Sequence, residues 1–214
     1  MNAVYTWEPR AGSAVLLQVG GLLLTVVGIV AFVALHALVR GGGSVQVAGP
    51  GLLAAVGALV AVSVVAVLAH EWIHGLAMRP FGARPVYSAG TVARVVPYLS
   101  CSAPGHLFRR GPYVWIALAP MLVLSTVFGV LVAWAPWGGL WAVAGGIHLG
   151  GCVGDLALSA VVLRRGRGGC LVEDTGAGLR LWPAPTTGPV PTTGPEPTTG
   201  PEQRQPGQGD ITSR

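Results

Sequence analysis

Four long apolar segments constrain the fold of this 214-residue chain more than any other feature of its sequence. The segments cover residues 14–39, 51–78, 113–135 and 140–163. Each is longer than the roughly 20 residues that a helix needs to cross a bilayer, and the first is too long for the apolar core of a secretory signal. Only 10% of the residues are charged, against about 25% in soluble domains. We therefore predict an all-α membrane protein with four transmembrane helices.

The segments between and around these spans suggest the domain organisation. We expect a short N-terminal segment at residues 1–13 and a four-span membrane domain at residues 14–169. Residues 170–182 could form a small hairpin. Residues 185–202 repeat a six-residue unit that begins Pro-Thr-Thr-Gly-Pro. Because this composition offers little apolar surface to bury, residues 183–214 are predicted to be a disordered tail.

The longest connection between two spans covers residues 79–112. Residues 85–100 in this loop are rich in valine and tyrosine, with a break at Ala89-Gly90, and a small hairpin against the membrane is possible there. Long loops of this kind usually have a function. We interpret His106, which lies in this loop, as a surface residue; a contact to a ligand or substrate is the alternative.

The arginines predict the membrane topology. All 13 basic residues are arginine, and an even number of spans places both termini on one side. That side would hold Arg10, the five arginines of the 79–112 loop and the cluster at 164–167, whereas the other side would hold only Arg40. The positive-inside rule then puts the termini and the loop in the cytoplasm, in a multi-pass protein of the cell membrane. The net charge of +5 therefore need not indicate a nucleic-acid partner.

The second span contains the sequence His70-Glu71-Trp72-Ile73-His74 near its C-terminal end. Two histidines four residues apart fall on one face of a helix, where they can bind the same zinc ion. The glutamate beside the first histidine can act as general base toward a water that the metal activates. Such groups are costly in a membrane span, which favours a functional interpretation.

Asp155 is the other acidic residue that falls inside an apolar span. A carboxylate there costs at least about 2.5–3.5 kcal/mol, so it is rarely present without a partner. Helix rise places His70, His74 and Asp155 within roughly 6–14 Å of the same membrane face. We therefore predict one Zn²⁺ ion bound by these three residues, with a position left open for water. The ligand types also allow iron, cobalt or manganese.

His148 and Cys152 share a helix face with Asp155. Because His148 lies two helical turns deeper in the span than Asp155, about 10 Å along the axis, it is a poor candidate for a metal ligand. It could instead contact the substrate or a developing oxyanion, or simply bond within the helix bundle.

Cys152 is interpreted as a packing residue, and the three cysteines of the chain form no disulfide framework. Small-x-x-x-small spacing would let this span approach another helix closely, as bringing Asp155 to the histidines requires. The glycines with this spacing are Gly145, Gly146, Gly150, Gly151 and Gly154.

These motifs resemble membrane-embedded zincins of the site-2-protease type and, more closely, a bacterial family of small membrane proteins called putative zincin peptidases. The resemblance covers about residues 50–182. The sequence departs from the true site-2 proteases, whose aspartate lies in an Asn-Pro-Asp-Gly motif, so substrate handling can differ. The segments that match the family are His70–Gly75, Arg110 with Ala117-Leu118-Ala119-Pro120, and Gly154-Asp155-Leu156. The departure is the run Cys152-Val153-Gly154-Asp155-Leu156, which stands in place of the Asn-Pro-Asp-Gly motif.

The resemblance implies zinc on His70, His74 and Asp155, with Glu71 as the base. It further implies a metalloendopeptidase that cuts a membrane-protein or peptide substrate at or within the cytoplasmic side of the membrane, in contact with lipid. The 79–112 loop could offer an edge strand to an extended substrate. A non-catalytic protein with a structural or regulatory metal is the alternative, although such a site needs no base. A transporter is a third interpretation, against which the lack of an internal repeat in the spans argues.

Overall fold

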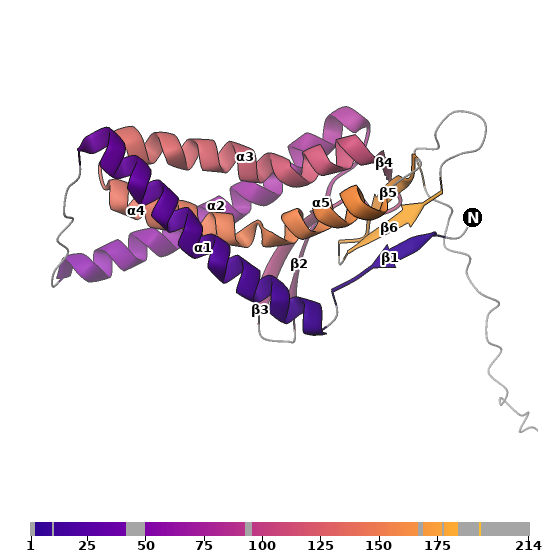
Figure 1. Cartoon of the computed structure of the whole chain (residues 1–214), viewed down its shortest axis with the longest axis horizontal. Coiled ribbons are helices and arrows are strands. Elements are labelled where there is room, and N and C mark those ends of the chain that lie inside the picture. The colour runs from indigo at the N-terminus through magenta and orange to yellow at the C-terminus, as the bar shows by residue number, and fades with distance from the viewer. Residues whose placement is uncertain are drawn as a thin grey trace, which may run out of the picture.

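The computed structural model describes residues 3–9, 11–41, 50–92, 96–166, 169–176, 178–183 and 193. Long helices form most of the described structure, with two small sheets beside them (Figure 1). The helices are α1 (Ala11–Arg40), α2 (Pro50–Met78), α3 (Arg110–Trp134), α4 (Gly138–Gly151) and α5 (Val153–Arg165), and a 3-10 turn, η1 (Arg79–Phe81), follows α2.

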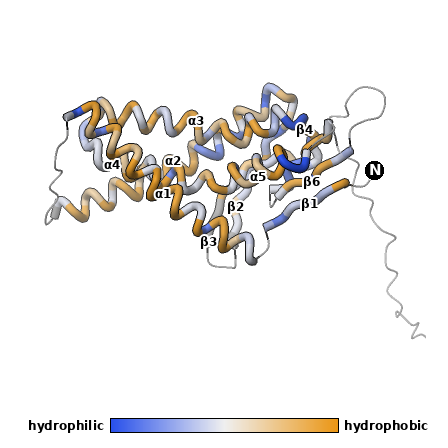
Figure 2. Tube along the Cα trace, viewed as in Figure 1, coloured by the Kyte–Doolittle hydropathy of each residue, from blue (hydrophilic) through white to orange (hydrophobic). Residues whose placement is uncertain are grey.

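Four helical stretches are long and apolar enough to cross a membrane, which confirms the predicted fold class. The first two expose large aliphatic side chains along much of their length, as expected for helices whose solvent is lipid. Figure 2 shows hydrophobic residues along the helices and hydrophilic ones at the end that carries the larger sheet. The four stretches are Gly12–Arg40, Gly51–Phe81, Arg110–Trp134 and Gly138–Arg165.

The fourth span is interrupted, although the sequence predicted one continuous helix there. Cys152 separates α4 from α5, with φ at −73° and ψ at 1°. Its backbone N–H lies 3.2 Å from the carbonyl oxygen of His148 and 3.1 Å from that of Leu149. The Cys152 N–H is therefore shared between an α-helical acceptor and a 3-10 acceptor. The neighbouring glycines lower the local helix propensity.

The glycines of α4 allow α1 to cross it at close range. A Cβ atom added at Gly28 would lie 3.0 Å from the Cα of Gly146, and one at Gly21 would lie 3.1 Å from the carbonyl oxygen of Gly150. A Cβ at Gly150 would overlap the side chain of Thr25. The predicted small-residue packing is thus present. Its partner is α1, however, and not the histidine-bearing α2.

The loop between α2 and α3 contains an antiparallel hairpin of β2 (Val86–Val92) and β3 (Val96–Ser102). This confirms the predicted hairpin. The predicted break is wrong, because Gly90 pairs with Tyr98 inside the ladder. The turn falls at residues 93–95, outside the described residues. Strand β3 lies against α2, which places the hairpin beside the helix that carries the histidines.

The second sheet has the strand order β1-β6-β5-β4, and all its pairs are antiparallel. Strands β5 and β6 form the hairpin that we expected at residues 170–182. The N-terminal strand β1 was not predicted, because three residues are too short to give a periodic signal. The strands are β1 (Tyr5–Trp7), β4 (Leu107–Arg109), β5 (Leu171–Asp174) and β6 (Leu179–Trp182).

An apolar cluster joins this sheet to the helix ends. It includes Phe108 and Val172 from the sheet, Tyr113 from α3 and Val162 from α5, all nearly inaccessible to solvent. The sheet therefore covers one end of the helix bundle (Figure 1). Apart from Pro183 and Thr193, the predicted tail at 183–214 lies outside the described residues.

Candidate metal and catalytic site

The structure brings His70, His74 and Asp155 together between α2 and α5. The Nε2 atoms of the two histidines are 3.1 Å apart. Asp155 places Oδ2 at 3.2 Å from His70 Nε2 and Oδ1 at 3.4 Å from His74 Nε2. A tetrahedral zinc ion with bonds of about 2.0–2.1 Å separates its ligand atoms by about 3.3 Å. The three side chains thus fit a shared zinc ion without rearrangement.

A proline in α3 orients His74. Pro120 has no N–H, so the carbonyl of Ile116, four residues earlier, lacks its usual helical donor. His74 supplies the missing bond, with Nδ1 at 3.0 Å from this carbonyl oxygen. Because Nδ1–H donates, neutral His74 presents Nε2 as a lone pair toward His70 and Asp155. A carbonyl that fixes the tautomer in this way is a common outer partner of metal-binding histidines.

The substitution Pro120→Ala should weaken zinc binding although residue 120 touches no metal. An alanine N–H would bond the Ile116 carbonyl and compete with His74 for it. We expect a loss of about 10–100-fold in zinc affinity, the range for removal of an outer partner, with the helix content unchanged or higher. Competition with a chromogenic chelator measures the affinity. Unchanged zinc affinity in Pro120→Ala would show that this bond does not orient His74.

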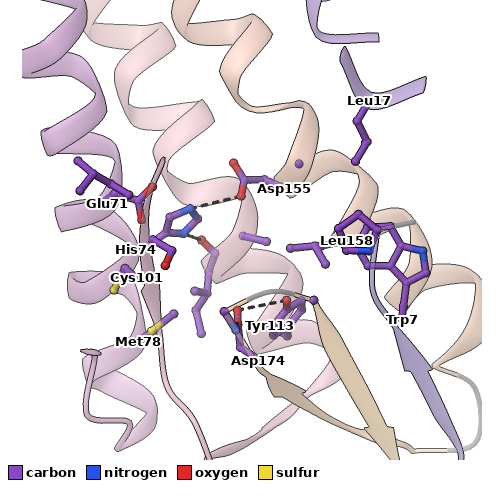
Figure 3. A pocket seen from close by; sticks show the side chains of 18 residues that line it. Trp7, Leu17, Glu71, His74, Met78, Cys101, Tyr113, Asp155, Leu158 and Asp174 are labelled. Carbon is purple, nitrogen blue, oxygen red and sulfur yellow. Dashed lines mark hydrogen bonds and ion pairs between the residues drawn. The ribbon is translucent and has the colours of Figure 1, made fainter. Parts of the chain in front are cut away.

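Glu71 lies at the same site, and strand β3 holds it. The backbone N–H of Cys101 donates to the Glu71 carboxylate, which joins the hairpin to the motif helix. Glu71, His74 and Asp155 line one cavity of about 280 Å³, and Figure 3 shows Glu71 and Asp155 on either side of the His74 ring. A carboxylate beside the ligands and open to a cavity can accept a proton from a water bound there.

The opposite wall of this cavity contains Asp174, which the sequence analysis did not identify. Tyr113 Oη donates to Asp174 Oδ2 over 3.4 Å, and the backbone N–H of Gly176 donates to Oδ1 over 2.8 Å. Burial raises the pKa of the Asp174 carboxyl above its usual value, although the Gly176 hydrogen bond opposes this change. Asp174 is the last residue of strand β5 and lies outside the spans, so the rule that identified Asp155 did not apply to it.

Cys101 faces the same cavity and should be a slow nucleophile. Burial, together with the negative charge of Glu71, raises the pKa of the Cys101 thiol to about 11. At pH 8 only about one molecule in a thousand would carry the thiolate. Alkylation of Cys101, followed by mass spectrometry, should therefore accelerate about tenfold per pH unit between pH 8 and pH 10. Glu71→Gln removes the negative charge and should speed the reaction, whereas a rate that levels off near pH 8 would contradict this prediction.

The two histidines proposed as secondary contacts differ in position. The ring centroid of His148 lies 5.5 Å from that of His70, so the His148 side chain lies beside a predicted ligand although His148 precedes Asp155 by seven residues in the fourth span. His148 is buried and lines a second cavity with His70 and Glu71. His106 lines neither cavity at the motif; its ring packs on Phe108 with centroids 4.5 Å apart. Burial lowers the pKa of His106.

Comparison with known proteins identifies the family of this chain. A family model described as "Putative zincin peptidase" matches residues 63–170, which is half of the chain. The matched region includes the histidine motif, the β2–β3 hairpin, α3 and Asp155. Searches of curated proteins and of solved structures found no significant match. Zincins are zinc peptidases, and the donor set formed by His70, His74 and Asp155 suits that metal. The chain belongs to the family of putative zincin peptidases, as a member with four helices that can span a membrane.

Proposed function

We propose that this protein is a zinc metalloendopeptidase of the site-2-protease type, which hydrolyses peptide bonds of membrane-associated substrates. The main support is the position of Glu71 beside three converging zinc ligands, inside helices that can cross a membrane. A purely structural metal site needs no such base. The cavity on this site gives a substrate access to it.

The residues of the chain divide the proposed reaction between them. When bound, zinc would polarise the scissile carbonyl and lower the pKa of a water. His70, His74 and Asp155 would hold the ion, and the Ile116 carbonyl keeps His74 in the tautomer that can bind it. Glu71 accepts the proton of the attacking water and passes it to the leaving amine. The Cys101 N–H fixes the direction from which the Glu71 carboxylate approaches.

An apolar groove supports a substrate that comes from the membrane. A groove of about 560 Å³ lies between α2 and the β2–β3 hairpin and is lined almost entirely by apolar residues. It shares Ser63, Val67 and Ile147 with the second cavity, which reaches His70 and Glu71. An apolar segment could therefore pass from the lipid side to the site. The hairpin could pair with an extended segment as an added strand, and replacing the hairpin with a neutral linker should then abolish cleavage.

The arginines support a site near the cytoplasmic face. Arg164 and Arg165 end α5, and Arg110 begins α3, where its Nη2 donates to the Leu163 carbonyl over 2.9 Å. At the other end of the bundle, Arg40 donates to carbonyls that end α3. With more arginines at the end that carries the larger sheet, the positive-inside rule orients that end toward the cytoplasm.

Metal removal tests the proposed function directly. The full-length protein in detergent micelles would be incubated with a library of peptides derived from membrane-protein juxtamembrane segments, and the products identified by mass spectrometry. We expect cleavage that stops after treatment with a zinc chelator and returns on addition of one equivalent of Zn²⁺. Stoichiometric zinc without cleavage of any member, in detergent and in bilayers, would favour the non-catalytic alternative.

A further inference from the structure

A second group of metal-binding side chains lies on the other side of His70. His148 and Cys152 are one helical turn apart on the fourth span, as His70 and His74 are on α2, and the ligand atoms of His70, His148 and Cys152 lie within 4.8 Å of one another. His148 is 8% exposed and Cys152 is 0% exposed. The ring centroids of His148 and His70 lie 5.5 Å apart, which places this pair beside the histidine motif.

The distance inside this pair suits a metal ion. Cys152 Sγ lies 3.6 Å from His148 Nε2. A tetrahedral zinc ion with bonds of about 2.3 Å to sulfur and 2.0–2.1 Å to nitrogen separates these atoms by about 3.6 Å. His70 completes the group, although its ring has to turn a short way toward the fourth span, because its Nε2 is hydrogen-bonded to His74 and Asp155.

The outer contacts of His148 resemble those of His74. The His148 ring hydrogen-bonds the carbonyl of Pro120, one turn along α3 from the Ile116 carbonyl that accepts from His74. Two carbonyls of α3, one helical turn apart, thus orient two histidines, and metal-binding histidines generally have such an outer hydrogen-bond partner. Access differs between the two groups. His74 and Asp155 line the cavity of about 280 Å³, whereas His70 and His148 line a separate cavity of about 250 Å³.

From this geometry we propose a second metal site formed by His70, His148 and Cys152, which binds thiophilic divalent ions such as Cd²⁺ or excess Zn²⁺. The two sites share His70, so an ion at the second site removes one ligand from the catalytic site. Sulfur favours soft ions, and the carboxylate of Asp155 favours harder ones. The second site would therefore inhibit the protein when thiophilic ions are abundant. The inhibition rests on the proposed function, but the second metal site does not, because metal binding can be measured without a substrate.

Cadmium spectroscopy tests this site. Full-length metal-free protein would be titrated with Cd²⁺ in detergent, and the ultraviolet charge-transfer band of a cadmium–thiolate bond recorded. We expect the band in wild type and in Cys101→Ser, the matched control for the other buried cysteine beside the motif. Cys152→Ser should lose the band but still bind one ion through His70, His74 and Asp155. Asp155→Ala should keep the band.

A band that persists in Cys152→Ser, or no band in wild type, would overturn the proposal. A second measurement needs no variant and therefore does not depend on correct folding of a mutant. Bound Cd²⁺ should slow alkylation of Cys152 in wild type at least tenfold, as followed by mass spectrometry of the labelled peptide, and should not slow alkylation of Cys101. Equal rates at Cys152 with and without Cd²⁺ would also overturn it.

Discussion

Glu71→Gln should abolish most of the proteolysis and leave zinc binding intact. The amide has the shape of the carboxylate, and its oxygen can still accept the hydrogen bond from the Cys101 N–H. It cannot accept a proton from water, however. General base catalysis typically contributes about 10²–10⁴-fold, so we expect kcat to fall by that factor. The measurements are turnover of a cleaved peptide and zinc content by elemental analysis of the same preparation.

Glu71→Asp is the matched comparison. It keeps the base but withdraws the carboxylate by one methylene from the ligands and from the Cys101 N–H. We expect activity between those of wild type and Glu71→Gln, because general base catalysis depends on hydrogen-bond reach. Glu71→Gln with full activity would remove Glu71 from the mechanism. Glu71→Gln without zinc would instead assign it a role in metal binding.

Asp155→Ala should lose both zinc and activity. The substitution leaves two histidines where catalytic zinc sites have three protein ligands. The affinity should fall by more than the roughly 10–100-fold that follows from loss of an outer partner. Folding should not suffer, since a carboxylate is costly in a span and alanine is not. The affinity is best compared between Cys152→Ser and Asp155→Ala/Cys152→Ser, because the thiol-containing site is then absent from both proteins.

Asp174→Asn is the control for Asp155→Ala. Asp174 is also a partly buried carboxylate on the cavity of Glu71 and His74, but it is not among the converging ligands. Zinc affinity should therefore stay within a fewfold of wild type. If Asp174→Asn and Asp155→Ala lost zinc equally, the effect would reflect the charge of the cavity and not direct coordination by Asp155.

The parts of this protein that the sequence predicted follow from the cost of polar groups in lipid. Apolar length identified the four spans. The expense of a buried carboxylate led to Asp155, and depth along a helix matched it to His70 and His74. These inferences need only one helix at a time and its distance from a membrane face, which helix rise supplies.

The features that the sequence did not predict depend on packing between elements. The interruption at Cys152 and the proximity of the His148 and His70 rings were both missed, and no local signal distinguishes such an interruption from ordinary glycine content in a span. The link from Pro120 through Ile116 to His74 was also missed. A proline predicts a free carbonyl, but which donor reaches that carbonyl depends on how α2 packs against α3. Strand β1 likewise exists only through its partner β6.

The strand order of the larger sheet has a consequence for biosynthesis. Its N-terminal strand, β1, pairs with its last strand, β6, and this pair therefore forms only after the chain has been synthesised at least as far as β6. The hairpin also carries Asp174 and Gly176, which close the wall of the cavity opposite the zinc ligands. A nascent chain that already contains Glu71 and both histidines thus still lacks that wall. Premature termination before residue 171 would yield a chain in which the cavity at Glu71 and His74 is incomplete.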